Sequence, residues 1–170
     1  MISRHDEHPG PIGRLLGGDH ARLDALLARA ADDSTAYTEF RRGLLRHIAM
    51  EEKVLLPAAQ RAGGGGPLPQ AATLRQDHGA LAALLVPTPT SAILAALRGI
   101  LTRHNALEEG PDGVYAACER LVGDEIVDLV VALRAVPQVP MRPHVDSDVA
   151  MNALRRALAR AGYVLESFQD

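Results

Sequence analysis

The chain carries one pattern of polar and apolar residues twice, once in each half. "DHARLDALL" at residues 19–27 matches "DHGALAALL" at residues 77–85 in six of nine positions. "RHIAMEE" at residues 46–52 matches "RHNALEE" at residues 103–109 in five of seven positions. Two copies of one helical hairpin, packed on each other, would form a bundle with an approximate internal two-fold axis. The duplication therefore constrains the fold more than any other feature of the sequence.

Apolar residues recur with helical periodicity, and no stretch alternates like a β-strand. Most of the apolar content is Ala and Leu, which favours helix over sheet. "GGGGP" at residues 63–67 separates the two halves, and Pro57 is expected to kink the second helix or end it early. We predict an all-α fold, an antiparallel up-down-up-down four-helix bundle with additional short C-terminal helices. Its main helices are expected at residues 12–30, 35–62, 70–86 and 91–108.

The C-terminal part of the chain is expected to form an appendage to this bundle. Two short helices are expected at residues 114–122 and 124–133. A Pro-rich linker at residues 137–143 and an amphipathic helix at residues 151–167 follow them. Asp146 or Ser147 can cap the last helix, and Gly162 can end it. We therefore predict a bundle over residues 10–136 and an appended segment over residues 137–170. Its helix would pack on the bundle or on a partner subunit, which would make a homodimer.

Composition and charge exclude several classes of partner. The net charge is -3, no run of Lys and Arg exceeds two residues, and aromatic residues make up 3% of the chain with no Trp. These features argue against a nucleic-acid partner. The single Cys118 cannot form an intrachain disulfide, and we find neither an apolar leader nor a membrane-spanning run. We expect a cytoplasmic protein without a membrane partner.

Six titratable residues fall on the apolar faces of the four predicted main helices. His20, for example, continues the row of apolar residues from Leu16 to Leu23. A His and a Glu four positions apart project from one helix face, about 6 Å apart along its axis. Burying such groups without partners would cost several kcal/mol each, which metal ions can offset. The six candidate metal ligands are His20, His47, Glu51, His78, His104 and Glu108.

The residue types indicate which metals fit. Imidazole nitrogen and carboxylate oxygen suit iron or manganese, with zinc and copper as alternatives. Six ligands are too many for one tetrahedral zinc, so they divide over two metals, each with two histidines and with the carboxylates as bridges. The alternative is a polar bundle interior in which the histidines bond to each other or to the backbone. We favour the metal site because the same spacing occurs twice.

On these residues the chain resembles the hemerythrin-like, or HHE cation-binding, domain family, over about residues 10–121. That family is a four-helix bundle with a non-haem di-iron centre. It carries His, His-x-x-x-Glu, His and His-x-x-x-Glu/Asp on successive helices. The resemblance implies two iron ions, with manganese or zinc as alternatives. It also implies that Glu51 and Glu108 bridge the metals, that His20 and His47 hold one metal, and that His78 and His104 hold the other.

One departure from the family bears on function. Oxygen-carrying hemerythrins have a second histidine one turn before the ligand of the third helix, where this chain has Leu74. The resemblance therefore implies open positions on the metals, and we expect a protein that binds or senses oxygen or nitric oxide or handles iron. The alternative is a di-iron enzyme in peroxide decomposition or iron-centre repair. The sequence does not decide whether the chain is an enzyme, and it favours a non-catalytic protein. A third hypothesis is a helical interaction module in which the metal is structural.

Residues beside the candidate ligands are expected to have lesser roles. Glu52 and Glu109 are expected to face solvent or to support the ligands. Asp19 and Asp77 could orient a neighbouring residue, but we expect them to be exposed. Tyr115 could approach the metal site, but we expect it to serve in packing. The remaining histidines are expected at the surface, at His5, His8 and His144.

Overall fold

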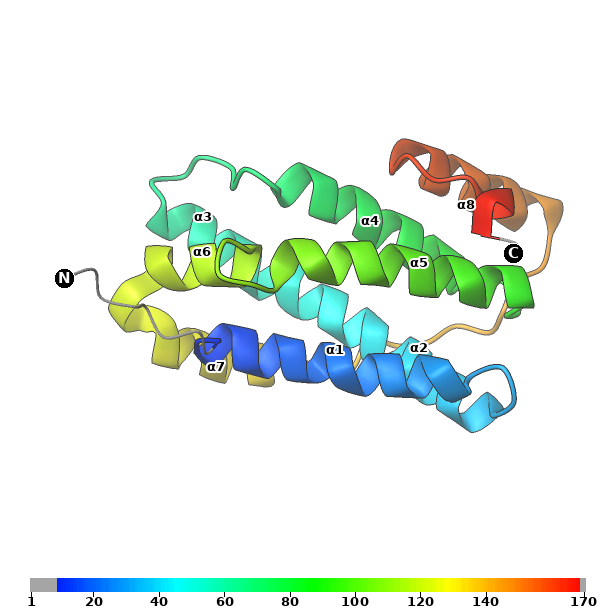
Figure 1. Ribbon diagram of the computed structural model, residues 1–170, viewed down its shortest axis with the longest axis horizontal. Helices are drawn as coiled ribbons and strands as arrows, with labels where there is room; N and C mark the ends of the chain where they lie inside the picture. Colours follow the sequence, from blue (N-terminus) through cyan, green and yellow to red (C-terminus); the bar gives the residue numbers. More distant parts are fainter. Residues whose placement is uncertain (1–8, 169–170) are drawn as a thin grey trace.

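A computed structural model describes residues 9–168, and within them every regular element is helical, which confirms the all-α prediction. Figure 1 shows the long helices side by side, running alternately in opposite directions along one elongated bundle. They are α1 (Pro11–Arg29), α2 (Ser34–Met50) continued by α3 (Leu56–Ala62), α4 (Ala71–Leu84) and α5 (Ser91–Glu108). Shorter elements follow: α6 (Val114–Val122), the 3-10 turn η2 (Gly123–Glu125), α7 (Ile126–Arg134), α8 (Asp148–Arg160) and the 3-10 turn η3 (Leu165–Phe168).

Several helices start where the sequence offers a capping side chain. The side chains of Asp33, Thr90 and Ser147 accept hydrogen bonds from backbone N–H groups at the starts of α2, α5 and α8. Ser147 is therefore the cap of the last helix. Asp146 instead accepts hydrogen bonds at 2.7 Å from both the backbone N–H and the hydroxyl of Thr88. This contact ties the linker before α8 to the connection between α4 and α5.

The second long helix neither ends nor breaks at Pro57. The chain forms a π-helical turn, η1 (Glu51–Leu55), and continues directly into α3. The N–H of Leu56 donates to the carbonyl of Glu51, five residues back. Pro57 has no N–H to donate and its ring crowds the preceding turn, so a wider turn before it relieves both problems. Because a π-helical turn contains an extra residue, it also changes which side chains face the bundle interior after Glu51.

A polar layer separates two apolar cores along the bundle. In α1, Ile12 and Leu16 belong to one core, whereas Leu23 and Leu27 belong to the other. His20 lies between these two pairs and is buried. The same order holds in α4, where Leu74 and Leu81 lie on opposite sides of His78. The polar residues of the repeat therefore lie in the middle of the helices, where apolar packing shields them from both ends.

The segment after the Pro-rich linker is packed against the bundle. α8 contacts α4 and η3 contacts α5, and Figure 1 shows α8 beside α4. Leu154, Leu158 and Tyr163 from this segment are buried in the same core as Leu81 of α4. Association with a second subunit stays a prediction. In the described part of the chain, no helix has both the length and the apolar character needed to cross a membrane.

Candidate metal centre

The structure brings all six predicted ligands together in the polar layer, and all six are buried. They form two overlapping groups, and within each group one ligand atom per residue lies within 4.8 Å of the others. We call these groups the first and the second metal position. The first position consists of His20, His47, Glu51 and Glu108, and the second of Glu51, His78, His104 and Glu108.

Glu51 faces both positions, with one carboxylate oxygen toward each. Its Oε1 lies 3.3 Å from Nε2 of His47, and its Oε2 lies 3.0 Å from Nε2 of His78. The second pair is not aligned as a hydrogen bond, so both atoms are buried without a hydrogen-bond partner among the described residues. Buried polar atoms of this kind require a partner, and an imidazole nitrogen beside a carboxylate oxygen fits a metal ion.

Glu108 repeats this arrangement from the opposite helix. Its Oε2 lies 3.3 Å from Nε2 of His20, and its Oε1 lies 3.2 Å from Nε2 of His104. Each carboxylate thus has one oxygen directed to each half of the duplicated sequence. This is the geometry that a carboxylate needs in order to bridge two metal ions.

The two histidines of each position lie against each other. The ring centroids of His20 and His47 are 4.6 Å apart, and those of His78 and His104 are 4.8 Å apart. In the first position the two Nε2 atoms are separated by 2.9 Å. Only one proton fits between these two atoms. If both nitrogens carried a proton, or if neither did, they would repel each other. A cation that accepts both lone pairs removes this conflict.

An outer ring of carboxylates contacts the Nδ1 atom of each of the four histidines in the cluster. An Nδ1–H that donates to a carboxylate fixes the tautomer and the ring orientation, and it leaves the Nε2 lone pair free for a metal. The Nδ1 contacts are His20 to Glu109 at 2.5 Å, His47 to Asp19 at 2.9 Å, His78 to Glu52 at 2.7 Å and His104 to Asp77 at 3.3 Å. All four imidazoles are thus oriented toward the two positions.

This ring corrects the expectation that Asp19 and Asp77 are exposed. Asp77 is 3% exposed and Asp19 is half-buried. Each precedes a candidate ligand on its own helix but reaches the histidine of the neighbouring helix. Glu52 and Glu109 support histidines, which was one of the two roles expected for them. The signal was present in the repeat, since both the Asp and the second Glu are duplicated together with the ligands.

Tyr115 packs in an apolar core, as expected, and it also reaches the site, which was the alternative role considered for it. This buried residue of α6 donates a hydrogen bond to Oε1 of Glu51 at 2.5 Å. Its hydroxyl oxygen also lies 3.1 Å from Oε2 of Glu108 and 3.1 Å from Nε2 of His20. All three atoms face the first position, so Tyr115 makes the two positions inequivalent. No residue of the repeat corresponds to it, so the duplication could not indicate its role.

In the metal-free cluster, the neighbouring carboxylates change the pKa values of the buried histidines. Burial lowers the pKa of His47, but the charge of Glu51 and hydrogen bonds to Asp19 and Glu51 outweigh it and raise the pKa to about 10. Burial likewise lowers the pKa of His104, and hydrogen bonds to Asp77 and Glu108 raise it to about 10. Without metal, these two imidazoles are therefore in the charged form at neutral pH, with both ring nitrogens protonated. Metal binding must displace one of these two protons from each imidazole.

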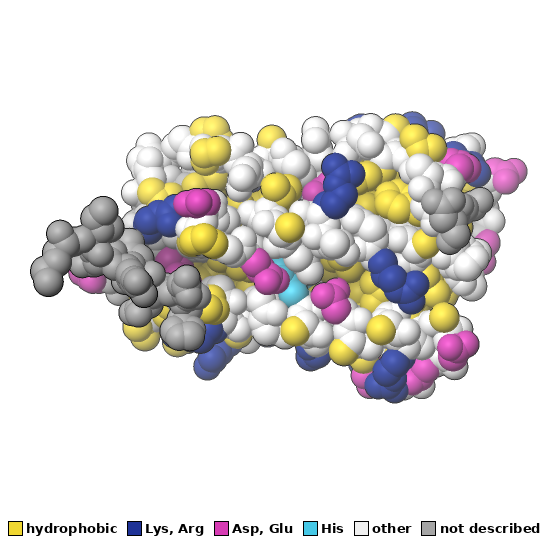
Figure 2. Space-filling view, viewed as in Figure 1, with side chains coloured by type: hydrophobic (Ala, Val, Ile, Leu, Met, Phe, Trp, Pro, Cys, Tyr) yellow, Lys and Arg dark blue, Asp and Glu magenta, His cyan; other side chains and the backbone are white. Residues whose placement is uncertain are grey.

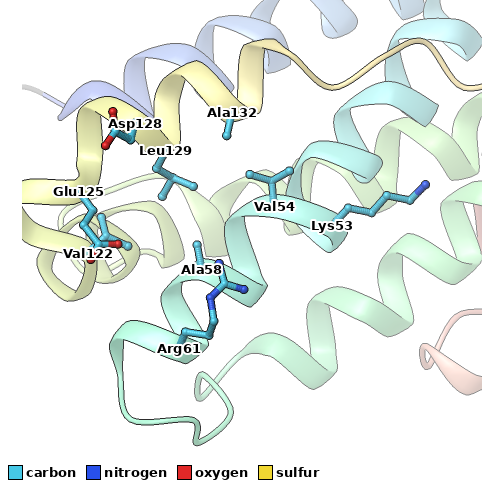
Figure 3. Close-up of a pocket in the computed structure, with 9 residues that line it drawn as sticks. All are labelled: Lys53, Val54, Ala58, Arg61, Val122, Glu125, Asp128, Leu129 and Ala132. Carbon is cyan, nitrogen blue, oxygen red and sulfur yellow. The ribbon is translucent and has the colours of Figure 1, made fainter.

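The six-residue cluster and the groove on the protein surface are at different places in the molecule. Figure 2 shows a small histidine surface in the middle of one face, flanked by acidic side chains. A groove of about 310 Å³ lies elsewhere, between α3 and α7 (Figure 3). Its walls include Val54, Ala58 and Leu129, and none of the six predicted ligands lines it. The groove is therefore distinct from the candidate metal centre.

Comparison with known proteins gives one match. The family model described as the hemerythrin HHE cation binding domain matches residues 12–112, which is more than half of the chain. The matched region contains all six predicted ligands, whereas Tyr115 and the segment from α6 onward lie outside it. Neither the curated proteins nor the solved structures give a significant match.

Proposed function

Since the chain belongs to the hemerythrin HHE cation-binding family, we propose that its buried cluster holds two iron ions in a non-haem di-iron centre. The observation that carries the proposal is the orientation of Glu51 and Glu108. Each directs one oxygen to a histidine of the first position and the other to a histidine of the second. A single metal ion would not need the four carboxylate oxygens of Glu51 and Glu108 to be divided between two positions. Two metal ions bridged by both carboxylates would use all four oxygens.

The residues of the chain would have distinct tasks in such a centre. The histidines would offer Nε2 to the metals, and the outer carboxylates would hold the rings in the required tautomer. Glu51 and Glu108 would bridge the two metal ions, and Tyr115 would hold Oε1 of Glu51 in place by its hydrogen bond. Iron in such a site supplies a redox-active Lewis acid that can take up a small ligand. Manganese and zinc prefer overlapping donor sets, so metal analysis must identify the ion.

We further propose that the centre binds or senses oxygen or nitric oxide, or that the protein handles iron. Each position has four donors from the cluster, fewer than the six of octahedral coordination. Leu74 lies one turn before His78 and is buried in an apolar core, so it adds no donor to the second position. The coordination that the protein leaves open supports the binding of a small ligand.

Iron loading of the full chain under nitrogen tests this proposal. We expect two iron ions per chain by elemental analysis, and a visible absorption change when oxygen or nitric oxide is admitted. Glu51→Ala should lose at least one iron, whereas Glu39→Ala, at an exposed position of α2, should retain both. Less than one iron per chain, or equal iron in the two variants, would contradict the proposal. Rapid turnover of added peroxide by the loaded protein would identify an enzyme instead.

A further inference from the structure

The second metal position is connected to the C-terminal segment through two hydrogen-bond contacts. Nδ1 of His104 lies 3.3 Å from Oδ2 of Asp77. The other oxygen of that carboxylate, Oδ1, accepts a hydrogen bond of 2.9 Å from the hydroxyl of Tyr163. Asp77 and His104 lie within the region that matches the family, and Tyr163 lies far outside it. A residue of the appended segment therefore reaches a candidate ligand through one intervening carboxylate.

Asp77 differs from the other outer carboxylates in what holds it. Asp19 accepts hydrogen bonds from the exposed Arg22 at 2.7 and 2.9 Å, and Glu52 accepts one from Arg75 at 3.2 Å. Asp77 is the most buried of the four, and its second contact is the neutral phenol of Tyr163. Because solvent has little access to it, the carboxylate depends on Tyr163 for its orientation.

Tyr163 is itself held in place by its surroundings. Gly162 has φ +82°, a conformation that favours glycine, and this turn directs the chain back from α8 toward the bundle. The backbone N–H of Tyr163 donates to the carbonyl of Leu158 at 2.9 Å. On its other side, the guanidinium of Arg103 lies 5.2 Å from the ring centroid, a cation–π contact. The phenol therefore has a fixed position relative to Asp77.

We propose that Tyr163 is a positioning residue for the second metal position and acts on His104 through Asp77. The inference rests on the proposed metal centre. The hydroxyl holds the Asp77 carboxylate in the rotamer that receives the Nδ1–H of His104, and that hydrogen bond directs the Nε2 lone pair to the metal. The C-terminal segment is then part of the metal centre as well as of the apolar core.

Release of iron from the full-length, Fe²⁺-loaded protein to a colorimetric chelator under nitrogen tests the proposal. In Tyr163→Phe we expect one of the two iron ions to leave about tenfold faster, the lower end of the effect of residues that orient metal ligands. The other iron should leave at the wild-type rate. Tyr37→Phe is a matched control, because its buried hydroxyl has no hydrogen-bond partner among the described residues. This control should release both ions at wild-type rates.

Two further measurements separate positioning from a general loss of packing. In the Zn²⁺-loaded protein, the ¹H–¹⁵N NMR signal of the His104 Nδ1–H should shift in Tyr163→Phe and stay unchanged in Tyr37→Phe. In an Asp77→Asn background, Tyr163→Phe should no longer accelerate iron release, because its effect passes through the carboxylate. A wild-type protein that holds two iron ions, with Tyr163→Phe indistinguishable from Tyr37→Phe, would overturn this inference alone. An undiminished effect of Tyr163→Phe in the Asp77→Asn background would do the same. A wild-type protein that holds no iron would overturn the proposed function, and this inference with it.

Discussion

Single side chains determine how the buried carboxylates are held, and the Tyr115 hydroxyl contacts both Glu51 and Glu108. Tyr115→Phe removes the hydrogen bond of 2.5 Å to Glu51 and leaves that buried oxygen poorly satisfied. We expect the free energy of unfolding of the metal-free protein to fall by about 1–3 kcal/mol. Urea denaturation of chelator-treated protein measures it, with Tyr37→Phe as the control. A loss no greater than that of Tyr37→Phe would show that the Tyr115 hydroxyl contributes nothing to the cluster.

Also at the residue scale, Asp19 should control metal affinity without being a ligand. Asp19→Asn weakens the acceptor for the Nδ1–H of His47, so the imidazole is a poorer and less well-oriented donor. We expect the dissociation constant for Zn²⁺ to rise about 10- to 100-fold, as measured by competition with a chromogenic chelator. Asp32→Asn, at an exposed position in the turn after the same helix, should bind Zn²⁺ as tightly as the wild type. Equal affinities in the two variants would argue against the orienting role.

At the scale of elements, the start of α1 depends on a side chain from α6. Gly10 precedes α1 and has no side chain to cap it, whereas Glu119 accepts hydrogen bonds from the N–H groups of Ile12 at 2.7 Å and Gly13 at 3.1 Å. The carboxylate also lies at the positive end of the helix dipole. α6 therefore fixes the end of the helix that carries His20.

Glu119→Ala should therefore lower the free energy of unfolding by about 1–2 kcal/mol, the usual loss for a helix cap. Glu119→Gln retains an acceptor oxygen and should lose less. Urea denaturation compares both with Glu39→Ala, whose side chain is exposed. If Glu119→Ala were as stable as Glu39→Ala, the contact between α6 and the start of α1 would be dispensable.

The helices and the six cluster residues could be predicted because both depend on periodicity along single helices. The contacts between the histidine Nδ1 atoms and the surrounding carboxylates could not be predicted, because they depend on how neighbouring helices are placed. Asp77 lies on α4 and meets His104 of α5 only because these two helices pack side by side. Tyr115 follows a turn whose direction the sequence does not specify. The π-helical turn before Pro57 likewise depends on a balance between proline sterics and the burial of Glu51.

At the scale of the whole molecule, the polar layer between two apolar cores couples stability to pH. In the metal-free protein the pKa values of His47 and His104 are raised to about 10 from a usual value near 6.5. Since the folded state binds these protons more tightly than the unfolded state, the resulting stabilisation is complete below about pH 6.5. It is lost as the pH rises toward 10. Metal ions compete with the same protons, so metal affinity should change in the opposite direction.

We therefore expect the free energy of unfolding of chelator-treated protein to fall steadily between pH 6.5 and about pH 10, since the histidine protons are lost over this range. The added stability of the Zn²⁺-loaded protein over the metal-free protein should rise over the same range, because fewer protons must be displaced. Urea denaturation at several pH values measures both trends. His47→Gln should flatten the metal-free trend, because it removes one of the two imidazoles whose pKa is raised to about 10. A metal-free stability that stays constant or increases with pH would show that the imidazoles are neutral in the folded protein, and the cluster would then be poised to bind metal without releasing protons.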